Sequence, residues 1–268
     1  MKTTKLLTIA LTLLIFSCKK DEVTTPADTC KVSVIDRGNN NKHTYTYDAA
    51  GKVATMTREF DGSGSGKISK YVYTFTYDNA GLLTKSTWTL AGVPNGSETY
   101  TYTAGKISKV SFKDVDGNAG TNNIKYDEAG RIVYFSVETG DPNADYIQYF
   151  TYDTNGIATK KGIKGFDGSV YFEVVIKPVG VAKSSEQLLS KYNLPYDVLT
   201  GYSWSVNQGD VGTIYESFLP DSNGKLVSDG KEKVTAVKLD TKGFIAEITL
   251  VDDAKVSSME RFTLMNCN

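Results

Sequence analysis

The chain has 268 residues, and its 30 Lys and Arg against 31 Asp and Glu give a formal net charge of −1 at pH 7. Proteins that bind nucleic acid neutralise phosphates with clustered Lys and Arg, so this balanced composition argues against a nucleic-acid partner. One histidine and three cysteines are present, and they show no Ser-His-Asp or Cys-His arrangement of a catalytic centre.

The N-terminus has the order of a secretory signal. Two lysines precede an almost wholly apolar run over residues 6–16, which is too short to span a bilayer, since a spanning helix needs about 20 apolar residues. The stretch 14–18 resembles the lipobox of bacterial lipoproteins, in which a cysteine is acylated and becomes the new N-terminus. An ordinary secretion signal with an incidental cysteine is the alternative. We expect a signal peptide over 1–17, lipidation of Cys18 and a lipidated tether over 18–29.

Two cysteines remain once Cys18 is assigned to lipidation. Cys30 and Cys267 lie near the two ends of the mature chain, and an exported protein resides in a compartment where disulfides form. We expect a disulfide between them. Two separate thiols are the alternative, because the sequence does not show that the two ends meet.

An internal repeat dominates the rest of the sequence. Its signature is Tyr-Asp, two further residues and Gly, and the third copy lacks one residue. Aspartate caps a turn with its side chain and glycine supplies a positive φ, so each copy should reverse the chain. The five copies are Tyr47-Asp48-Ala49-Ala50-Gly51, Tyr77-Asp78-Asn79-Ala80-Gly81, Tyr102-Thr103-Ala104-Gly105, Tyr126-Asp127-Glu128-Ala129-Gly130 and Tyr152-Asp153-Thr154-Asn155-Gly156, with degenerate copies at Asp221-Ser222-Asn223-Gly224 and Asp240-Thr241-Lys242-Gly243.

Extended runs flank these turns. Every second residue from Tyr71 to Tyr77 is aromatic, which is the two-residue period of a β-strand. An aliphatic residue such as Val53 or Leu83 begins each outgoing strand. The predicted fold is all-β: one β-repeat domain over 30–268, an antiparallel β-meander of YD-like hairpin repeats. The sequence leaves open whether the sheet is open, closed or folded into a sandwich.

One stretch departs from the repeat. Ser184 can cap the start of a helix, Gln187 follows three residues later, and Pro195 comes beyond the end, as in a short capped helix. We predict one short helix near 184–191 that covers an end of the sheet.

The YDxxG turns with their following aliphatic residue resemble the YD repeats of Rhs-type proteins. Together with the lipobox, the layout over residues 30 to 265 resembles a family of Bacteroidetes lipoproteins with YD-like repeats, and Lys19-Lys20-Asp21-Glu22 resembles the tethers of their surface-exported members. The resemblance implies a β-sheet fold and a surface-exposed lipoprotein of the outer membrane. It supplies no catalytic or binding residues.

Three motifs have simpler explanations than the sites they suggest. The Gly-Ser run at 62–67 lacks the Gly and Ser/Thr that a phosphate loop needs at Asp61 and Ile68. The Asp-rich stretches 114–118 and 221–224 miss the EF-hand spacing and fit turns instead. His43 lies in an alternating run and is read as a strand residue. We expect no metal site and no cofactor.

Function is predicted as competing classes. A non-enzymatic structural or protein-binding module comes first, because repeats build surfaces more readily than catalytic pockets. The alternative is a glycan-binding accessory lipoprotein of a polysaccharide-uptake system, and an enzyme is the third class. Most tyrosines should cover one sheet face and pack on their neighbours, so the candidate ligand contacts are Trp204, Tyr202 and Trp88.

Overall fold

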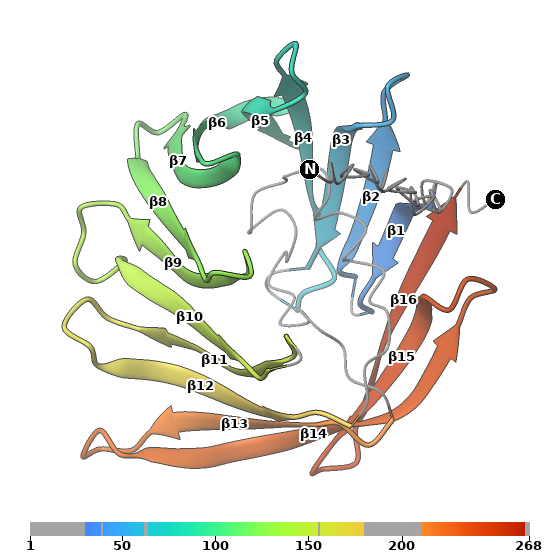
Figure 1. The fold of residues 1–268 in the computed structure, drawn as a ribbon, viewed down its shortest axis with the longest axis vertical. Helices are drawn as coiled ribbons and strands as arrows, with labels where there is room; N and C mark the ends of the chain where they lie inside the picture. Colours follow the sequence, from blue (N-terminus) through green and yellow to red (C-terminus); the bar gives the residue numbers. More distant parts are fainter. Residues whose placement is uncertain (1–29, 39, 62–63, 155, 180–210, 266–268) are drawn as a thin grey trace, which may run out of the picture.

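The protein is a closed barrel of sixteen antiparallel β-strands in the computed structural model, which describes residues 30–265 except 39, 62–63, 155 and 180–210 (Figure 1). The strands are β1 (Lys31–Asp36), β2 (Lys42–Tyr47), β3 (Val53–Phe60), β4 (Ser69–Tyr77), β5 (Leu83–Leu90), β6 (Val93–Thr103), β7 (Lys106–Asp114), β8 (Ala119–Tyr126), β9 (Ile132–Glu138), β10 (Tyr146–Tyr152), β11 (Ala158–Lys164), β12 (Val170–Lys177), β13 (Ile214–Pro220), β14 (Leu226–Leu239), β15 (Ile245–Asp252) and β16 (Ser257–Met265).

Pairing between the first and last strands closes the sheet. Lys31 lies opposite Met265, and Ile35 lies opposite Phe262. The predicted meander of hairpin repeats is therefore wrong as a description of the fold, because the strands close into a barrel. Closure leaves no free edge strand, which removes unpaired backbone groups that would otherwise attract other chains. No described residue is helical, and the segment 184–191 lies outside the described residues. The described part of the chain also has no helix that could cross a membrane.

The repeat turns have the predicted geometry. In the turn from Asp78 to Leu82, the Gly81 amide donates to the Asp78 carbonyl oxygen (3.0 Å), and the Leu82 amide donates to Asp78 Oδ1 (2.8 Å). Gly81 has a φ of +87°, a conformation that glycine adopts without strain. The shortened third copy forms a two-residue turn in which Ala104 and Gly105 both have positive φ. The same backbone bonds recur at 114–118 and 221–225, so both Asp-rich stretches are turns.

The two faces of the wall differ in polarity. One face is apolar and buried, and it forms a core that includes Val32, Tyr45 and Ile248. The other face is polar, with cross-strand ion pairs such as Lys160–Glu173 (3.0 Å). The described chain forms only the wall and its turns (Figure 1), so the covered face is the inner one.

A repeated hydrogen bond links each repeat to the one before it. The tyrosine that precedes each turn donates its hydroxyl to a backbone carbonyl oxygen at the start of an earlier strand. We call Tyr47, Tyr77, Tyr102, Tyr126 and Tyr152 the repeat tyrosines; their acceptors are the carbonyls of Val32 (2.7 Å), Val53 (2.9 Å), Leu83 (2.9 Å), Ile107 (2.9 Å) and Ile132 (2.8 Å).

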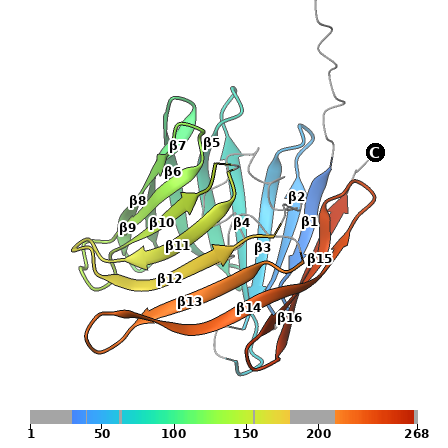
Figure 2. The same cartoon turned by 60° about the horizontal axis from the view of Figure 1, so that its bottom comes forward.

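The alternating strand direction gives the barrel two distinct ends. The five repeat turns lie at the end where β1 begins and β16 finishes, which we call the repeat-turn end. The turns after β1, β3, β5, β7, β9, β11, β13 and β15 form the opposite rim. The turned view shows these hairpins along the continuous wall (Figure 2). Because β1 starts at the repeat-turn end, the described chain begins there.

Candidate functional site

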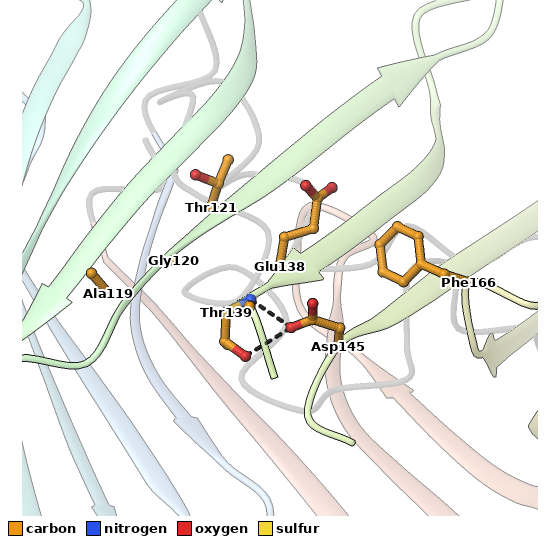
Figure 3. A pocket seen from close by; sticks show the side chains of 8 residues that line it. Ala119, Gly120, Thr121, Glu138, Thr139, Asp145 and Phe166 are labelled. Atoms are coloured by element: carbon orange, nitrogen blue, oxygen red, sulfur yellow. Dashed lines mark hydrogen bonds between the residues drawn. The ribbon is translucent and has the colours of Figure 1, made fainter. Parts of the chain in front are cut away.

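A pocket of about 440 Å³ lies at the opposite rim, between three neighbouring turns (Figure 3). The pocket is shallow and widely open to solvent. We call it the rim pocket. It is lined by Ala119, Gly120 and Thr121 from the start of β8, Glu138 from the end of β9, Thr139, Gly140 and Asp145 from the following loop, and Phe166 from the β11–β12 turn.

Strand register fixes one side of the rim pocket. Thr121 lies directly opposite Glu138 in the pairing of β8 with β9, so both side chains leave the same face of the sheet. Gly120 beside them is required by close packing, since a Cβ there would lie 2.4 Å from Phe112 Cζ and 2.6 Å from the Glu138 carbonyl oxygen. This side of the pocket therefore rests on rigid sheet.

Glu138 is held in place by two neutral donors. Its Oε1 accepts hydrogen bonds from Asn123 Nδ2 (2.7 Å) and Ser136 Oγ (2.7 Å). Both donors lie on the same two strands, β8 and β9. Neither bond uses Oε2, so a ligand at the pocket would meet a carboxylate oxygen already fixed in direction.

Asp145 organises the loop after β9 that lines the pocket. Its Oδ1 accepts from the amide of Thr139 (2.5 Å) and from Thr139 Oγ1 (2.7 Å), the two bonds drawn in Figure 3. The amides of Ala144 and Asp145 both donate to the Asp141 carbonyl oxygen at 2.9 Å. Hydrogen bonds from Thr139 hold the pKa of Asp145 below its usual range, so this carboxylate is ionised at neutral pH.

Phe166 presents an aromatic ring at the tip of a hairpin. Phe166 is 53% exposed as a residue, and Figure 3 shows its ring to one side of Glu138 and Asp145. The turn that carries it closes through the Gly165 amide, which donates to the Ser169 carbonyl oxygen (2.8 Å). An aromatic face beside fixed oxygen acceptors can bind a ligand that has one apolar surface and hydrogen-bond donors at its edge.

The predicted ligand contacts do not line the rim pocket. Trp88 lies half-buried on the inner face, stacked on Tyr73 with ring centroids 6.1 Å apart. Its ring covers Gly96, where a Cβ would lie 2.1 Å from Trp88 Cζ2. Trp204 and Tyr202 lie outside the described residues. Contact of any of these three with a ligand remains a prediction.

The other predicted sites are placed only in part. Cys30 is fully buried at the start of β1, whereas Cys18 and Cys267 lie outside the described residues. His43 is a strand residue, as predicted, but it is fully buried on the inner face and not near a sheet edge, since the barrel is closed. No cluster of three or more His, Cys, Asp or Glu suited to a metal occurs among the described residues.

Sequence reasoning missed the residues of the rim pocket. The one available signal was Phe166, since a turn between two glycines usually carries small or polar residues and this one carries a large aromatic residue. Glu138 and Asp145 gave no such signal, because acidic residues are common at strand ends and turns. Their proximity depends on register across β8 and β9 and on the loop after β9.

The fold is similar to that of a porin-like protein from Bacteroides uniformis ATCC 8492, with a TM-score of 0.54 and 13% identity over 87% of this chain and 98% of that one. A porin-like protein from Bacteroides vulgatus ATCC 8482 matches at a TM-score of 0.36 and 12% identity, over 87% of this chain and 97% of that one. The Tc holotoxin pore of Photorhabdus luminescens matches at 0.31 and 14%, over 82% of this chain and 12% of that one.

No protein-family model and no curated protein matches the sequence. The first of these likenesses agrees with the expected Bacteroidetes resemblance at the level of an all-β protein, while lipidation and membership of a YD-repeat family stay predictions. At 13% identity, what is shown is a barrel fold shared with a porin-like Bacteroides protein.

Proposed function

We propose that this protein is a non-enzymatic lipoprotein of the cell envelope that binds a glycan at the rim pocket. One observation carries the proposal: the exposed ring of Phe166 stands beside Glu138 and Asp145, whose carboxylates are fixed by neutral hydrogen-bond donors. A sugar ring has an apolar C–H face and hydroxyl donors at its edge. It therefore matches both parts of the pocket, the aromatic face and the acceptors.

Asp145 is suited to accept hydrogen bonds from a ligand. The hydrogen bonds from Thr139 lower the pKa of Asp145, so its carboxylate is ionised at neutral pH. As a hydrogen-bond acceptor for sugar hydroxyls, an ionised Asp145 is well suited.

The position of the rim pocket suits a protein tethered through Cys18. The tether would join the barrel at the repeat-turn end, and the pocket lies at the opposite rim. A ligand would then be met on the side away from the membrane. Two or more acyl chains give stable attachment where one does not, so we propose an outer-membrane lipoprotein that presents the rim pocket at the cell surface.

A glycan array tests the binding function. The mature domain, produced without lipid, should bind one class of glycan, and Phe166→Ala should weaken that binding at least about tenfold, equivalent to about 1.4 kcal/mol. Val115→Ala is the matched control, because Val115 is also an exposed apolar residue at a turn of the same rim and does not line the pocket. A blank array, or equal binding by Phe166→Ala, would refute the proposal.

The lipid anchor has its own test. The expressed precursor should partition with membranes, and Cys18→Ala should release it. A Cys18→Ala protein that still sediments with membranes would show that another element anchors the chain.

Protein binding at the same rim is the second candidate, favoured by the exposed apolar residues that gather there. Isolated surface hydrophobics are ordinary, but a grouping of them can mark an interaction site. With the array blank, site-specific crosslinks to one purified envelope protein from rim positions, absent from repeat-turn positions, would support it. The rim residues are Ile68, Val93, Val115, Phe166, Tyr171, Leu219, Val227 and Val256.

A further inference from the structure

The rim pocket carries negative charge without a compensating cation. Its two charged lining residues are Glu138 and Asp145, and its other lining residues are uncharged. The donors that hold these carboxylates, Asn123, Ser136 and Thr139, are also neutral. From this we infer that the ligand is an amino sugar, a glycan bearing a free ammonium group; the inference rests on the proposed glycan-binding function.

Other carboxylates on the outer face are treated differently. Glu173 pairs with Lys160 (3.0 Å), Glu216 with Lys177 (2.9 Å), and Glu247 with Arg261 (3.1 Å). In the described part of the chain, Glu138 has hydrogen bonds but no such ion pair, and neither has Asp145 in the adjoining loop. The pocket therefore leaves two negative charges available to a ligand.

Nearby lysines do not supply the cation that would balance these two carboxylates. Lys164 lies over the Tyr149 ring (5.5 Å to the centroid), and Lys125 lies over the Tyr134 ring (4.6 Å). Lys113 is opposite Ala119 in the pairing of β7 with β8, but it does not line the pocket. An ammonium group on the ligand would supply the missing cation.

Two carboxylate oxygens of the pocket also favour an amino sugar as the ligand. Glu138 Oε2 and Asp145 Oδ2 take no part in the hydrogen bonds that fix these side chains. An ammonium group has three donors and no acceptor, and charge-assisted hydrogen bonds are roughly twice as strong as neutral ones. A uronic acid or sulfated sugar would instead bring like charge to the pocket. The expected order of affinity is therefore cationic, then neutral, then anionic sugar.

Four glycosides with the same ring test this order by isothermal titration calorimetry on the mature domain. They are methyl β-glucosaminide, its N-acetyl derivative, methyl β-glucoside and methyl β-glucuronide. The glucosaminide should bind at least about tenfold more tightly than its N-acetyl derivative, which has the same framework without the charge. Because exposed charges are screened by salt, this preference should shrink between 50 mM and 500 mM NaCl.

Two variants locate the effect. Glu138→Gln and Asp145→Asn should each weaken binding of the glucosaminide more than binding of the glucoside, and so reduce the preference for the glucosaminide. Glu247→Gln is the control, because Glu247 is an outer-face carboxylate paired with Arg261 and lies outside the pocket. Circular dichroism on each variant checks folding, and either pocket variant alone suffices if the other fails to fold.

The outcomes separate the two proposals. Equal or tighter binding of the neutral glycosides, with Phe166→Ala still weakening them, would overturn the amino-sugar inference and leave the glycan-binding function standing. An array blank with no glycoside bound would remove the function itself. A glucosaminide preference unchanged in both pocket variants would show that the selectivity arises elsewhere, which also overturns the inference.

Discussion

The hydroxyl of Tyr77 donates to the carbonyl oxygen of Val53 over 2.9 Å, although the two residues are 24 positions apart. Val53 begins β3 and Tyr77 ends β4, so the bond ties the turn that follows Tyr77 to the strand that leaves the previous turn. A cation completes the contact, since Lys52 Nζ lies 5.1 Å from the centre of the Tyr77 ring. Each repeat is thereby bonded to its predecessor at one end of the barrel.

Removing one of these hydroxyls should measure what the contact contributes. Tyr77→Phe keeps the ring and loses the bond to the Val53 carbonyl, so we expect the free energy of unfolding to fall by about 0.5–1.5 kcal/mol. Urea denaturation followed by circular dichroism gives this value. Tyr171→Phe, at an exposed rim tyrosine, should change it by less than about 0.5 kcal/mol. If both variants change the unfolding free energy equally, the hydroxyl bond of Tyr77 adds no stability, and the repeat tyrosines contribute through their rings alone.

The third repeat lacks the cation and offers a gain-of-stability test. In the other repeats, the residue just before the carbonyl acceptor is basic and lies over the tyrosine ring. Here the acceptor is Leu83, the residue before it is Leu82, and the Tyr102 ring therefore has no such cation. The other pairs are Lys31 over Tyr47, Lys52 over Tyr77, Lys106 over Tyr126 and Arg131 over Tyr152. Leu82→Lys should raise the unfolding free energy by about 0.5–1 kcal/mol, measured by urea denaturation. Leu82→Gln, of similar length and uncharged, should not reproduce the gain.

His43 should make stability depend on pH below about 6.5. Burial, and then the charges of Arg37 and Arg58, lower the pKa of His43 from 6.5 to about 3. The neutral ring is the form that the fold holds, so its contribution is complete above pH 6.5 and is lost as pH falls toward 3. The expected slope is about 1.4 kcal/mol per pH unit, because the unfolded chain binds a proton that the native state does not.

Comparison with His43→Gln isolates this slope. Carboxylates titrate in both proteins and cancel in the difference, so wild type should lose more unfolding free energy than the variant between pH 6.5 and pH 5. Urea midpoints at pH 7, 6, 5.5 and 5 measure the difference. Parallel pH profiles would mean that His43 is able to take up a proton in the folded state.

Barrel closure strengthens the predicted disulfide. Lys31 and Met265 are directly opposite, so Cys30 precedes one partner by one residue and Cys267 follows the other by two. Mass spectrometry of a non-reduced tryptic digest should find the two peptides joined. Reduction should lower the unfolding free energy, by roughly 5 kcal/mol at most in the chain-entropy model for a loop of this length. Two alkylatable thiols in protein recovered from the periplasm would contradict it.

Local features of the fold were readable from the sequence, because they depend on neighbouring residues. Asp78 and Gly81 specify a turn by side-chain capping and positive φ, and the aromatic alternation before it specifies a strand. Closure was not readable. It depends on β13 to β16, where one turn departs from the repeat pattern, because Lys255 takes the positive-φ position that glycine holds in the repeats. The total number of strands that pair is not encoded in any short stretch of the sequence.

The role of the repeat tyrosines was also hidden from a pattern analysis. The pairing of β4 with β5 shifts between Thr76 and Tyr77, as at a β-bulge, and bulges re-aim the side chains next to them. Period alone predicts packing on cross-strand neighbours, so the bond from Tyr77 to Val53 was not anticipated. The rim pocket was missed for a related reason, since Phe166 and Glu138 line one pocket only after the strands from β8 to β12 have paired.

A crystal structure of the mature domain with its best array ligand tests the central claim most directly. The account predicts a sugar ring in the rim pocket, with its C–H face on Phe166 and its donors on Glu138 Oε2 and Asp145 Oδ2. A sugar seated instead against Trp88 on the inner face, or anywhere away from Phe166, would contradict the assignment of the rim pocket as the binding site.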